Sequence, residues 1–325
     1  MNITPIRPRP AEGIPGDLPT IIVQYLQHRT LRGAALNTVK AYGDDLRRLT
    51  AYLARYDVTL VQLVSERLLN RWIDDGLLHH KWSRRTAARR LSAARAFLQW
   101  ARGEGYVDHD AAAHVHIRFR PRQVIAPELD PLKRVVAAIG TDDALDLRDR
   151  AILMLLLDAA LRSSEVALLD AFDPMQPRPV YCVDTDRSRV YVRPKGADHD
   201  DETEVLGIEP QTVAAVQAWT DRREAIARPG VPALFVNLLG TRFSRQSLYV
   251  MVRNRGAAVG LPRLHPHLFR HRRVGDVTER LGIDAGCALA RHKQRSTTVN
   301  VYGAHAAEVQ RAAIRNLCPL GEVSP

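Results

Sequence analysis

The apolar positions between residues 37 and 53 recur at the spacing of a helix. They follow one another at intervals of three and four residues, which places them on one helix face, and Asn37 is a candidate N-cap in front of them. These positions are Val39, Tyr42, Leu46, Leu49 and Leu53. A further helix is expected over residues 66–78. The first third of the chain is therefore predicted to be helical.

A longer helix is predicted to begin at Ser83 and to reach about Arg102. Its apolar stripe repeats at helical spacing and consists of Ala87, Leu91, Ala94, Leu98 and Ala101. The same segment contains six arginines and no acidic residue. An ordinary solvated helix face mixes both signs of charge, so a single sign favours a DNA-facing helix over that alternative. The candidate DNA contacts on this helix are Arg84, Arg85, Arg89 and Arg90.

From residue 127 onward the pattern mixes helices with short strands. The expected helices cover about 130–140, 146–161, 210–223, 244–259, 267–281 and 305–317. Residues 180–183 and 190–192 have the composition of short strands joined by a turn, and 203–208 is a candidate third strand. The predicted fold class is mainly α with a small antiparallel β-sheet in the second domain.

Proline and basic residues mark the predicted domain boundaries. Residues 1–17 are rich in proline and are expected to form a flexible N-terminal arm. A helical domain is predicted over 18–117 and a second domain over 127–325. The basic linker 118–126 between them contains the candidate phosphate contacts Arg118, Arg120 and Arg122.

The charge balance indicates the kind of partner. The 325 residues include 47 Lys and Arg against 36 Asp and Glu, a formal net charge of +11. Such an excess favours double-stranded DNA as the partner, although solubility alone is the alternative. Neither a signal peptide nor an apolar run of the ~20 residues that a membrane span needs is visible. The three cysteines (182, 287 and 318) are isolated, which indicates no disulfide framework or zinc site. A cytoplasmic, nucleoid-associated protein is expected.

Breaking a DNA phosphodiester requires a nucleophile, cations around the phosphoryl oxygens and a proton donor for the leaving oxygen. Arg162 stands where one apolar helix ends and another begins, with Ser163 or Ser164 as its expected N-cap. Glu165 is placed to hold the guanidinium of Arg162. An ordinary helix-end salt bridge is the alternative. Lys195 lies at the tip of the predicted sheet, where a proton donor or an exposed turn lysine would fit.

Two further segments carry candidate chemistry. His267 and Arg270 are three residues apart and therefore share a helix face. Neighbouring arginines disfavour a metal ion among the histidines of this segment, so no metal and no cofactor are predicted. His292 lies in a basic turn, and Tyr302 follows ten residues later. A tyrosine phenol has a pKa near ~10, so it attacks poorly unless cations stabilise its phenolate; a packing tyrosine is the alternative.

Taken together, five segments resemble the tyrosine recombinase family. They are LRSSEVALL (161–169), RPKG (193–196), HLFRH (267–271), ARH (290–292) and STTVNVY (296–302), and they occur in the family's order. There are three departures. Arg291 stands where the family carries glycine, Arg272 where threonine is usual, and the segment between Arg162 and Lys195 is rich in proline. The two arginines are expected to preserve catalysis and to add positive charge.

The resemblance implies a helical core-binding domain over 18–117, a catalytic domain over 127–325 and a role for each residue. Tyr302 would attack the phosphate, Arg162 and Arg270 would clamp its oxygens, and Lys195 would protonate the leaving oxygen. His267 would handle the tyrosine proton, and His292 would bind the phosphate by a hydrogen bond. Arg272 and Arg273 are further candidate DNA contacts.

The resemblance also implies a tetramer on DNA, in which the predicted helix 305–317 docks on a neighbouring subunit; packing within its own subunit is the alternative. No membrane and no small-molecule substrate are expected. Three other functions stay open: a catalytically silent DNA-binding regulator, a type IB topoisomerase and a metal-dependent nuclease.

Overall fold

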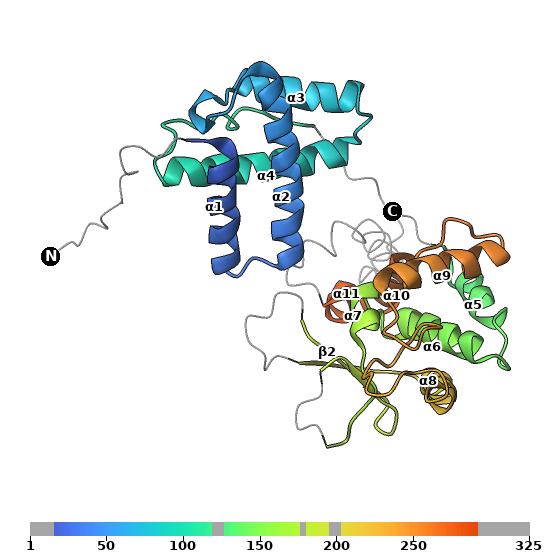
Figure 1. Cartoon of the computed structure of the whole chain (residues 1–325). Coiled ribbons are helices and arrows are strands. Elements are labelled where there is room, and N and C mark those ends of the chain that lie inside the picture. The colour runs from blue at the N-terminus through green and yellow to red at the C-terminus, as the bar shows by residue number, and fades with distance from the viewer. Residues whose placement is uncertain (1–15, 119–126, 176–179, 195–202, 292–325) are drawn as a thin grey trace, which may run out of the picture. The chain divides into compact units, whose positions relative to one another are not determined.

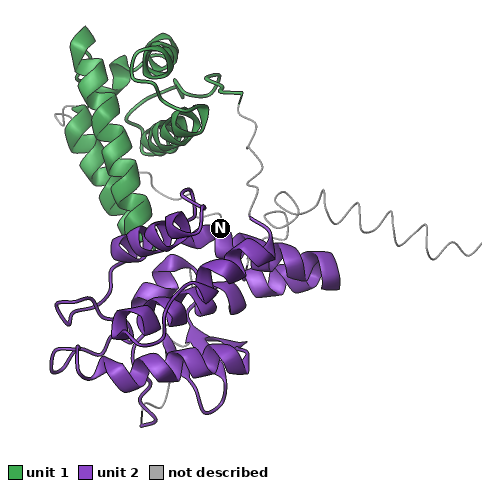
Figure 2. Cartoon of the chain, turned by 90° about the vertical axis from the view of Figure 1, so that its right-hand side faces the viewer, with its two compact units in different colours: residues 1–122 green, residues 123–325 purple. Residues whose placement is uncertain are grey.

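The computed structural model describes residues 16–118, 127–175, 180–194 and 203–291. The chain divides into two compact units, residues 1–122 and 123–325 (Figure 2). Each unit has its own hydrophobic core. The predicted fold class is confirmed, because helices predominate and a small antiparallel sheet lies in the second unit.

Unit 1 is helical in its described part (Figure 1). Its elements are α1 Leu18–Leu31, α2 Leu36–Leu53, the short 3-10 helices η1 Ala54–Tyr56 and η2 Val61–Leu63, α3 Glu66–Leu78 and α4 Arg84–Gly103. The bounds predicted for α3 and α4 are confirmed. Each of the two has a serine N-cap, because Ser65 Oγ accepts from Leu68 N (3.4 Å) and Ser83 Oγ from Thr86 N (3.1 Å).

Two details of unit 1 differ from the expectation. Asn37 does not cap a helix, because α2 begins at Leu36 after Ala35. Helix α1 was not predicted, because its apolar residues 21–23 are consecutive and do not show helical spacing. Asp17 caps α1 by accepting from Thr20 N (3.2 Å).

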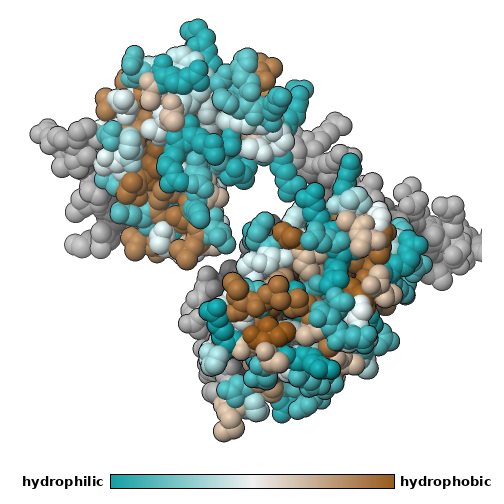
Figure 3. Space-filling model, turned by 45° about the vertical axis from the view of Figure 1, so that its right-hand side comes forward, coloured by the Kyte–Doolittle hydropathy of each residue, from teal (hydrophilic) through white to brown (hydrophobic). Residues whose placement is uncertain are grey.

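The cores of α2 and α4 follow the predicted apolar faces. All five stripe residues of α4 are buried, and Phe97 and Ala93 join them. In α2, Leu46, Leu49 and Leu53 are buried, whereas Val39 and Tyr42 are half-buried. The end of unit 1 where α1 meets α2 is different, because Val23, Leu31 and Leu36 expose most of their apolar surface there (Figure 3).

Unit 2 combines helices with one three-stranded sheet (Figure 1). Its described elements are α5 Leu129–Ala137, α6 Ala144–Asp158, α7 Ser163–Leu168, β1 Cys182–Asp184, β2 Arg189–Val192, β3 Glu204–Gly207, α8 Pro210–Arg223, α9 Arg245–Ala258, α10 Pro266–Leu281 and α11 Ile283–Ala290. The strand order is β1-β2-β3 with both pairs antiparallel, and Val190 pairs with Val183 and Leu206. Helix α11 was not predicted.

Two left-handed turns and the packing of α10 position the site in unit 2 that is described below. Helix α6 ends at Asp158, earlier than expected, and Ala160 takes a left-handed conformation (φ 48°) before α7 begins. Helix α10 packs against both α6 and α11. At the end of α11, Arg291 is also left-handed (φ 48°). These turns bring the end of α6, the start of α7, α10 and the end of α11 together.

Within the described ranges, no helix combines the length and hydrophobicity that crossing a membrane requires.

Candidate active site

Arg162 occupies the N-cap position of α7, so neither Ser163 nor Ser164 caps this helix as expected. Its backbone N–H donates to Glu165 Oε2 (2.7 Å), and its side-chain Nη1 donates to Glu165 Oε1 (2.6 Å). The contact expected between Glu165 and the Arg162 guanidinium is therefore present. Glu165 itself is buried, which fixes its carboxylate in one position.

Arg270 is brought to the same place by α10. Its side chain donates from Nη1 to the Ala160 carbonyl and from Nη2 to the Ala290 carbonyl. Arg162 Nη2 also donates to the Ala290 carbonyl (3.3 Å) and to that of Arg291 (3.2 Å). Because the Ala290 carbonyl accepts from both arginines, the two guanidinium groups lie side by side. Two adjacent guanidinium groups match the oxygens of a phosphate group.

His267 lies one helical turn before Arg270. Its ring packs against the ring of His271, with the ring centres 4.3 Å apart and nearly perpendicular. Partial burial lowers the pKa of His267, and the charges of Arg270, His265 and Arg162 lower it further. The imidazole is therefore neutral near pH 7 and is able to accept a proton.

A third arginine joins this cluster. The Arg291 side chain is 3% exposed, and its Nη2 lies 2.7 Å from Glu165 Oε2. Its Nε lies 3.8 Å from Oε2 of Glu204, which belongs to β3. Burial lowers the pKa of Arg291, whereas Glu165 raises it. The sequence marked Arg291 only as a departure from the family pattern, and Glu204 was missed because nothing in its local sequence distinguishes it.

Tyr181, immediately before β1, was also missed. It is half-buried and left-handed (φ 54°). Burial raises its pKa, and so does Glu165; the charges of Arg193, Arg162 and Arg291 oppose this rise. A raised pKa makes the Tyr181 phenol a poor nucleophile although it lies near the arginines.

Arg272 and Arg273 contact carboxylates on and around α10. Arg272 lies 3.1 Å from both Glu128 and Glu279, and Arg273 lies 3.8 Å from Asp158. The extra charge expected from Arg272 is therefore offset by these acids. The contact of Arg272 and Arg273 with DNA stays a prediction. The ion pairs make such a contact less favourable, because a bound phosphate would have to compete with the carboxylates.

The arginines of α4 fall into two groups. Arg84 and Arg85 are exposed, and Arg84 Nη1 donates to the carbonyl of Arg118 (3.3 Å). Arg89 and Arg90 both approach the buried carboxylate of Asp45, Arg89 Nη2 at 3.0 Å and Arg90 Nε at 3.5 Å. The guanidinium of Arg90 also lies 3.9 Å from the centre of the Trp82 ring. Arg90 is therefore part of the packing of unit 1.

Several predicted site residues lie outside the described residues. They are Lys195, His292, Tyr302, Arg120 and Arg122, together with the predicted helix 305–317. Among the residues that the structure does describe, no group of three or more His, Cys, Asp or Glu is placed to hold a metal ion.

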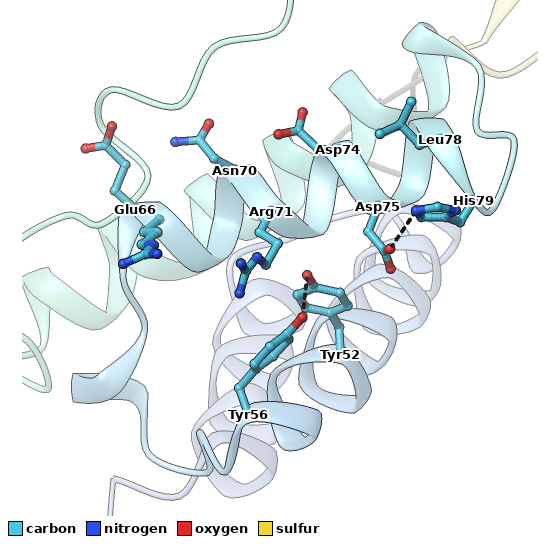
Figure 4. A pocket seen from close by; sticks show the side chains of 10 residues that line it. Tyr52, Tyr56, Glu66, Asn70, Arg71, Asp74, Asp75, Leu78 and His79 are labelled. Carbon is cyan, nitrogen blue, oxygen red and sulfur yellow. Dashed lines mark hydrogen bonds and ion pairs between the residues drawn. The ribbon is translucent and has the colours of Figure 1, made fainter.

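A groove of about 1000 Å³ lies in unit 1. Tyr52, Tyr56 and α3 line it, and the side chains of Asp74 and Asp75 lie along its α3 side (Figure 4). Asp75 lies 3.9 Å from His79. Side chains of both charges line the groove, because Glu66, Asp74 and Asp75 lie beside Arg67 and Arg71.

The adjacent arginines of unit 2 form a cationic cluster around the Ala290 carbonyl. Residues 22–105 match the model of the phage integrase N-terminal SAM-like domain, and residues 128–308 match that of the phage integrase family. The chain therefore belongs to the phage integrase family, and the resemblance to tyrosine recombinases is confirmed.

Relatives and solved structures agree with this assignment. The tyrosine recombinase XerD of Mycobacterium tuberculosis (strain CDC 1551 / Oshkosh) is 31% identical over 265 residues, which are 76% of this chain and 80% of that protein. The fold is similar to that of the Tn1549 transposon integrase in complex with transposon right end DNA (TM-score 0.70, 15% identity, 93% of this chain and 99% of that chain). It is also similar to a lambda integrase tetramer bound to a Holliday junction (TM-score 0.64, 12% identity, 88% and 78%). At these identities the two structures establish the fold alone.

Proposed function

We propose that this protein is a site-specific DNA recombinase that cleaves and rejoins DNA strands through a 3′-phosphotyrosyl intermediate. The observation that carries the proposal is the pair of guanidinium groups of Arg162 and Arg270, held side by side by the Ala290 carbonyl. Membership of the family indicates the reaction, and the two guanidinium groups would bind the phosphate that reacts.

The proposed reaction proceeds by two transesterifications. The Tyr302 oxygen attacks phosphorus, its proton passes to the neutral imidazole of His267, and the bond from phosphorus to the 5′-oxygen breaks. Lys195 gives its proton to the departing 5′-oxygen, which leaves as a hydroxyl. The 5′-hydroxyl of a second strand then attacks the phosphotyrosyl bond and releases Tyr302. The energy of the broken bond is retained in the covalent link, so exchange needs no ATP.

The arginines act where charge accumulates. Negative charge builds on the non-bridging oxygens in the transition state, and fixed cations stabilise that charge without reorganising. Arg162 and Arg270 are fixed because Glu165 and the carbonyls of Ala160 and Ala290 hold their guanidinium groups. His292 is proposed to add a hydrogen bond to the phosphate.

We further propose residues 18–117 as the core-binding domain, 118–126 as the linker and 127–325 as the catalytic domain. DNA binding would use the exposed Arg84 and Arg85, the half-exposed Arg89 and the linker arginines Arg118, Arg120 and Arg122. Assembly into a tetramer on DNA is proposed by analogy with the lambda integrase tetramer. A DNA substrate would place the protein in the cytoplasm with the nucleoid.

Trapping on a nicked duplex tests the proposed function. Duplexes drawn from DNA that flanks the gene carry a nick near the cleavage site, so that a short fragment leaves and the covalent complex accumulates. With EDTA present, we expect a protein–DNA complex that survives a denaturing gel. DNA binding without a complex across all flanking duplexes would favour a silent regulator, and cleavage that EDTA abolishes would favour a metal-dependent nuclease. Relaxation of supercoiled DNA by a monomer would indicate a topoisomerase.

The α4 arginines give a prediction with a matched pair of variants. Arg85→Ala should weaken DNA binding and reduce the slope of log affinity against log salt by about 0.9, the effect of one lost phosphate contact. Its stability should not change, because Arg85 is exposed. Arg90→Ala should instead lower the free energy of unfolding by about 1–3 kcal/mol, because it leaves the buried Asp45 with one arginine fewer. An unchanged salt slope for Arg85→Ala in fluorescence-anisotropy titrations would exclude this face of α4 from the DNA.

A further inference from the structure

The backbone at the end of α11 is part of the phosphate site, but the side chain at position 291 is not required for that backbone. The carbonyls of Ala290 and Arg291 accept from Arg162, and the chain reaches this shape with Arg291 in a left-handed conformation (φ 48°). Glycine adopts that conformation without the strain that a side chain brings. A large charged side chain at this strained position therefore calls for a separate explanation.

The side chains of Arg291 and Arg162 both donate hydrogen bonds to the carboxylate of Glu165. Arg162 Nη1 donates to Glu165 Oε1 (2.6 Å), whereas Oε2 accepts from both Arg291 Nη2 (2.7 Å) and the Arg162 backbone N–H (2.7 Å). All three groups are largely buried, with side chains 21%, 3% and 5% exposed for Arg162, Arg291 and Glu165. Charges in such surroundings act strongly on one another because little water screens them. Without Arg291, the negative charge of Glu165 would act mainly on Arg162.

Arg291 also adds positive charge beside the two carboxylates of the cluster. Glu165 and Glu204 together offset the charges of Arg162 and Arg270, so these four groups have no net charge. Arg291, 2.7 Å from Glu165 and 3.8 Å from Glu204, makes the five groups positive. A positive cluster attracts a phosphate and stabilises the extra charge of its transition state.

Arg291 forms one close ion pair, with Glu165, and makes fewer hydrogen bonds than its guanidinium could. Its Nη1 and Nε are buried and have no hydrogen-bond partner among the described residues. Glu204 Oε2 is also buried without a hydrogen-bond partner among the described residues, because its distance of 3.8 Å from Arg291 Nε is too long for a hydrogen bond. Buried donors without partners destabilise a fold. Within the described part of the chain, Arg291 therefore combines a left-handed backbone with two donors that have no partner.

We propose that Arg291 is a positioning residue for strand cleavage: it shares Glu165 Oε2 with the Arg162 backbone, so that the negative charge of Glu165 does not act on the Arg162 guanidinium alone. This inference rests on the proposed function. Because Arg291 acts through Glu165, its loss should slow the chemical step more than it weakens DNA binding.

Three variants separate charge, volume and backbone shape at this position. Arg291→Gly removes the side chain and suits the left-handed backbone, Arg291→Met keeps volume without charge, and Arg291→Lys restores the charge. We expect Gly and Met to lower the single-turnover cleavage rate at saturating DNA by about tenfold to a hundredfold. The DNA Kd should change less than about threefold. Because the buried Glu165 loses a partner, the free energy of unfolding should fall by about 1–3 kcal/mol, so rates are measured well below the melting temperature. Lys should recover most of the rate.

Binding of orthovanadate, measured by calorimetry on the same full-length proteins, reports the phosphate site independently of cleavage. The wild type should bind this anion about tenfold more tightly than the Gly and Met variants, with Lys close to the wild type. If the wild type fails to cleave yet shows this pattern, the proposed function falls, and the effect of Arg291 on anion binding through Glu165 and Arg162 stands. Equal vanadate binding by the wild type and the Gly and Met variants would overturn the inference, and so would wild-type cleavage rates in the Gly variant.

Discussion

Replacing Tyr302 with phenylalanine is expected to abolish the covalent protein–DNA complex. Phenylalanine keeps the ring but lacks the oxygen that attacks phosphorus, so the rate should fall by at least about 10⁴-fold, below detection on a denaturing gel. DNA affinity in a gel-shift assay should stay within about threefold of the wild type, since the proposed cationic contacts remain. Loss of the complex with retained binding would assign the nucleophile.

Tyr181 provides the matched control for that variant. It is the described tyrosine whose phenol interacts electrostatically with Arg162 and Arg291, but burial and Glu165 raise its pKa. Tyr181→Phe should therefore form the complex at a rate within about threefold of the wild type. A complex that persists in Tyr302→Phe and disappears in Tyr181→Phe would reverse the two assignments.

Replacing Arg270 with alanine should produce the second large effect. Removing one fixed donor from a developing oxyanion lowers a rate by about 10²–10³-fold, and we expect that loss in single-turnover cleavage. The carbonyls of Ala160 and Ala290 also lose a donor, so the free energy of unfolding should fall by about 1–3 kcal/mol. The rate is therefore measured well below the melting temperature of the variant.

The pH profile distinguishes the loss of Arg270 from simple instability. Burial and then the charge of Arg270 lower the pKa of His267, so the imidazole stays neutral and able to accept a proton until the pH falls below the ordinary histidine range. Without Arg270 that pKa rises, and the acidic limb of the rate profile should move to higher pH. An unmoved limb would contradict the proposed role of His267.

Arg280→Ala is the matched control for Arg270→Ala. Arg280 lies on the same helix with its side chain 71% exposed, and it pairs with Asp276 at 3.0 Å. An exposed pair contributes about 0–1 kcal/mol, so cleavage should change less than about twofold. A comparable loss of rate in both variants would indicate general damage to α10.

Local patterns were sufficient to predict the elements that have clear periodicity or capping. Helices α3 and α4 begin after serines that do cap them, and α8 has the predicted bounds. Helix α1 was missed because its consecutive apolar residues hide the helical repeat. The end of α6 was misplaced because no local pattern marks the left-handed turn at Ala160, whose carbonyl accepts from Arg270 of α10.

The candidate site was predictable only as a set of side chains. The sequence indicated Arg162, Glu165, His267 and Arg270, and the structure brings these four residues together. The backbone carbonyls that hold the arginines have no sequence signal, because every residue has a carbonyl and only the fold places it. The ion pair of Arg291 with Glu165 joins residues 126 positions apart, so no local pattern reveals it.

Mapping the modified residue tests the central claim most directly. The covalent complex from the nicked duplex is digested with nuclease and protease, and the peptide that retains nucleotide mass is sequenced by mass spectrometry. We predict a phosphotyrosyl link at Tyr302, in the peptide that begins at Ser296. Nucleotide mass on Tyr181 or on any other residue would contradict the proposed mechanism.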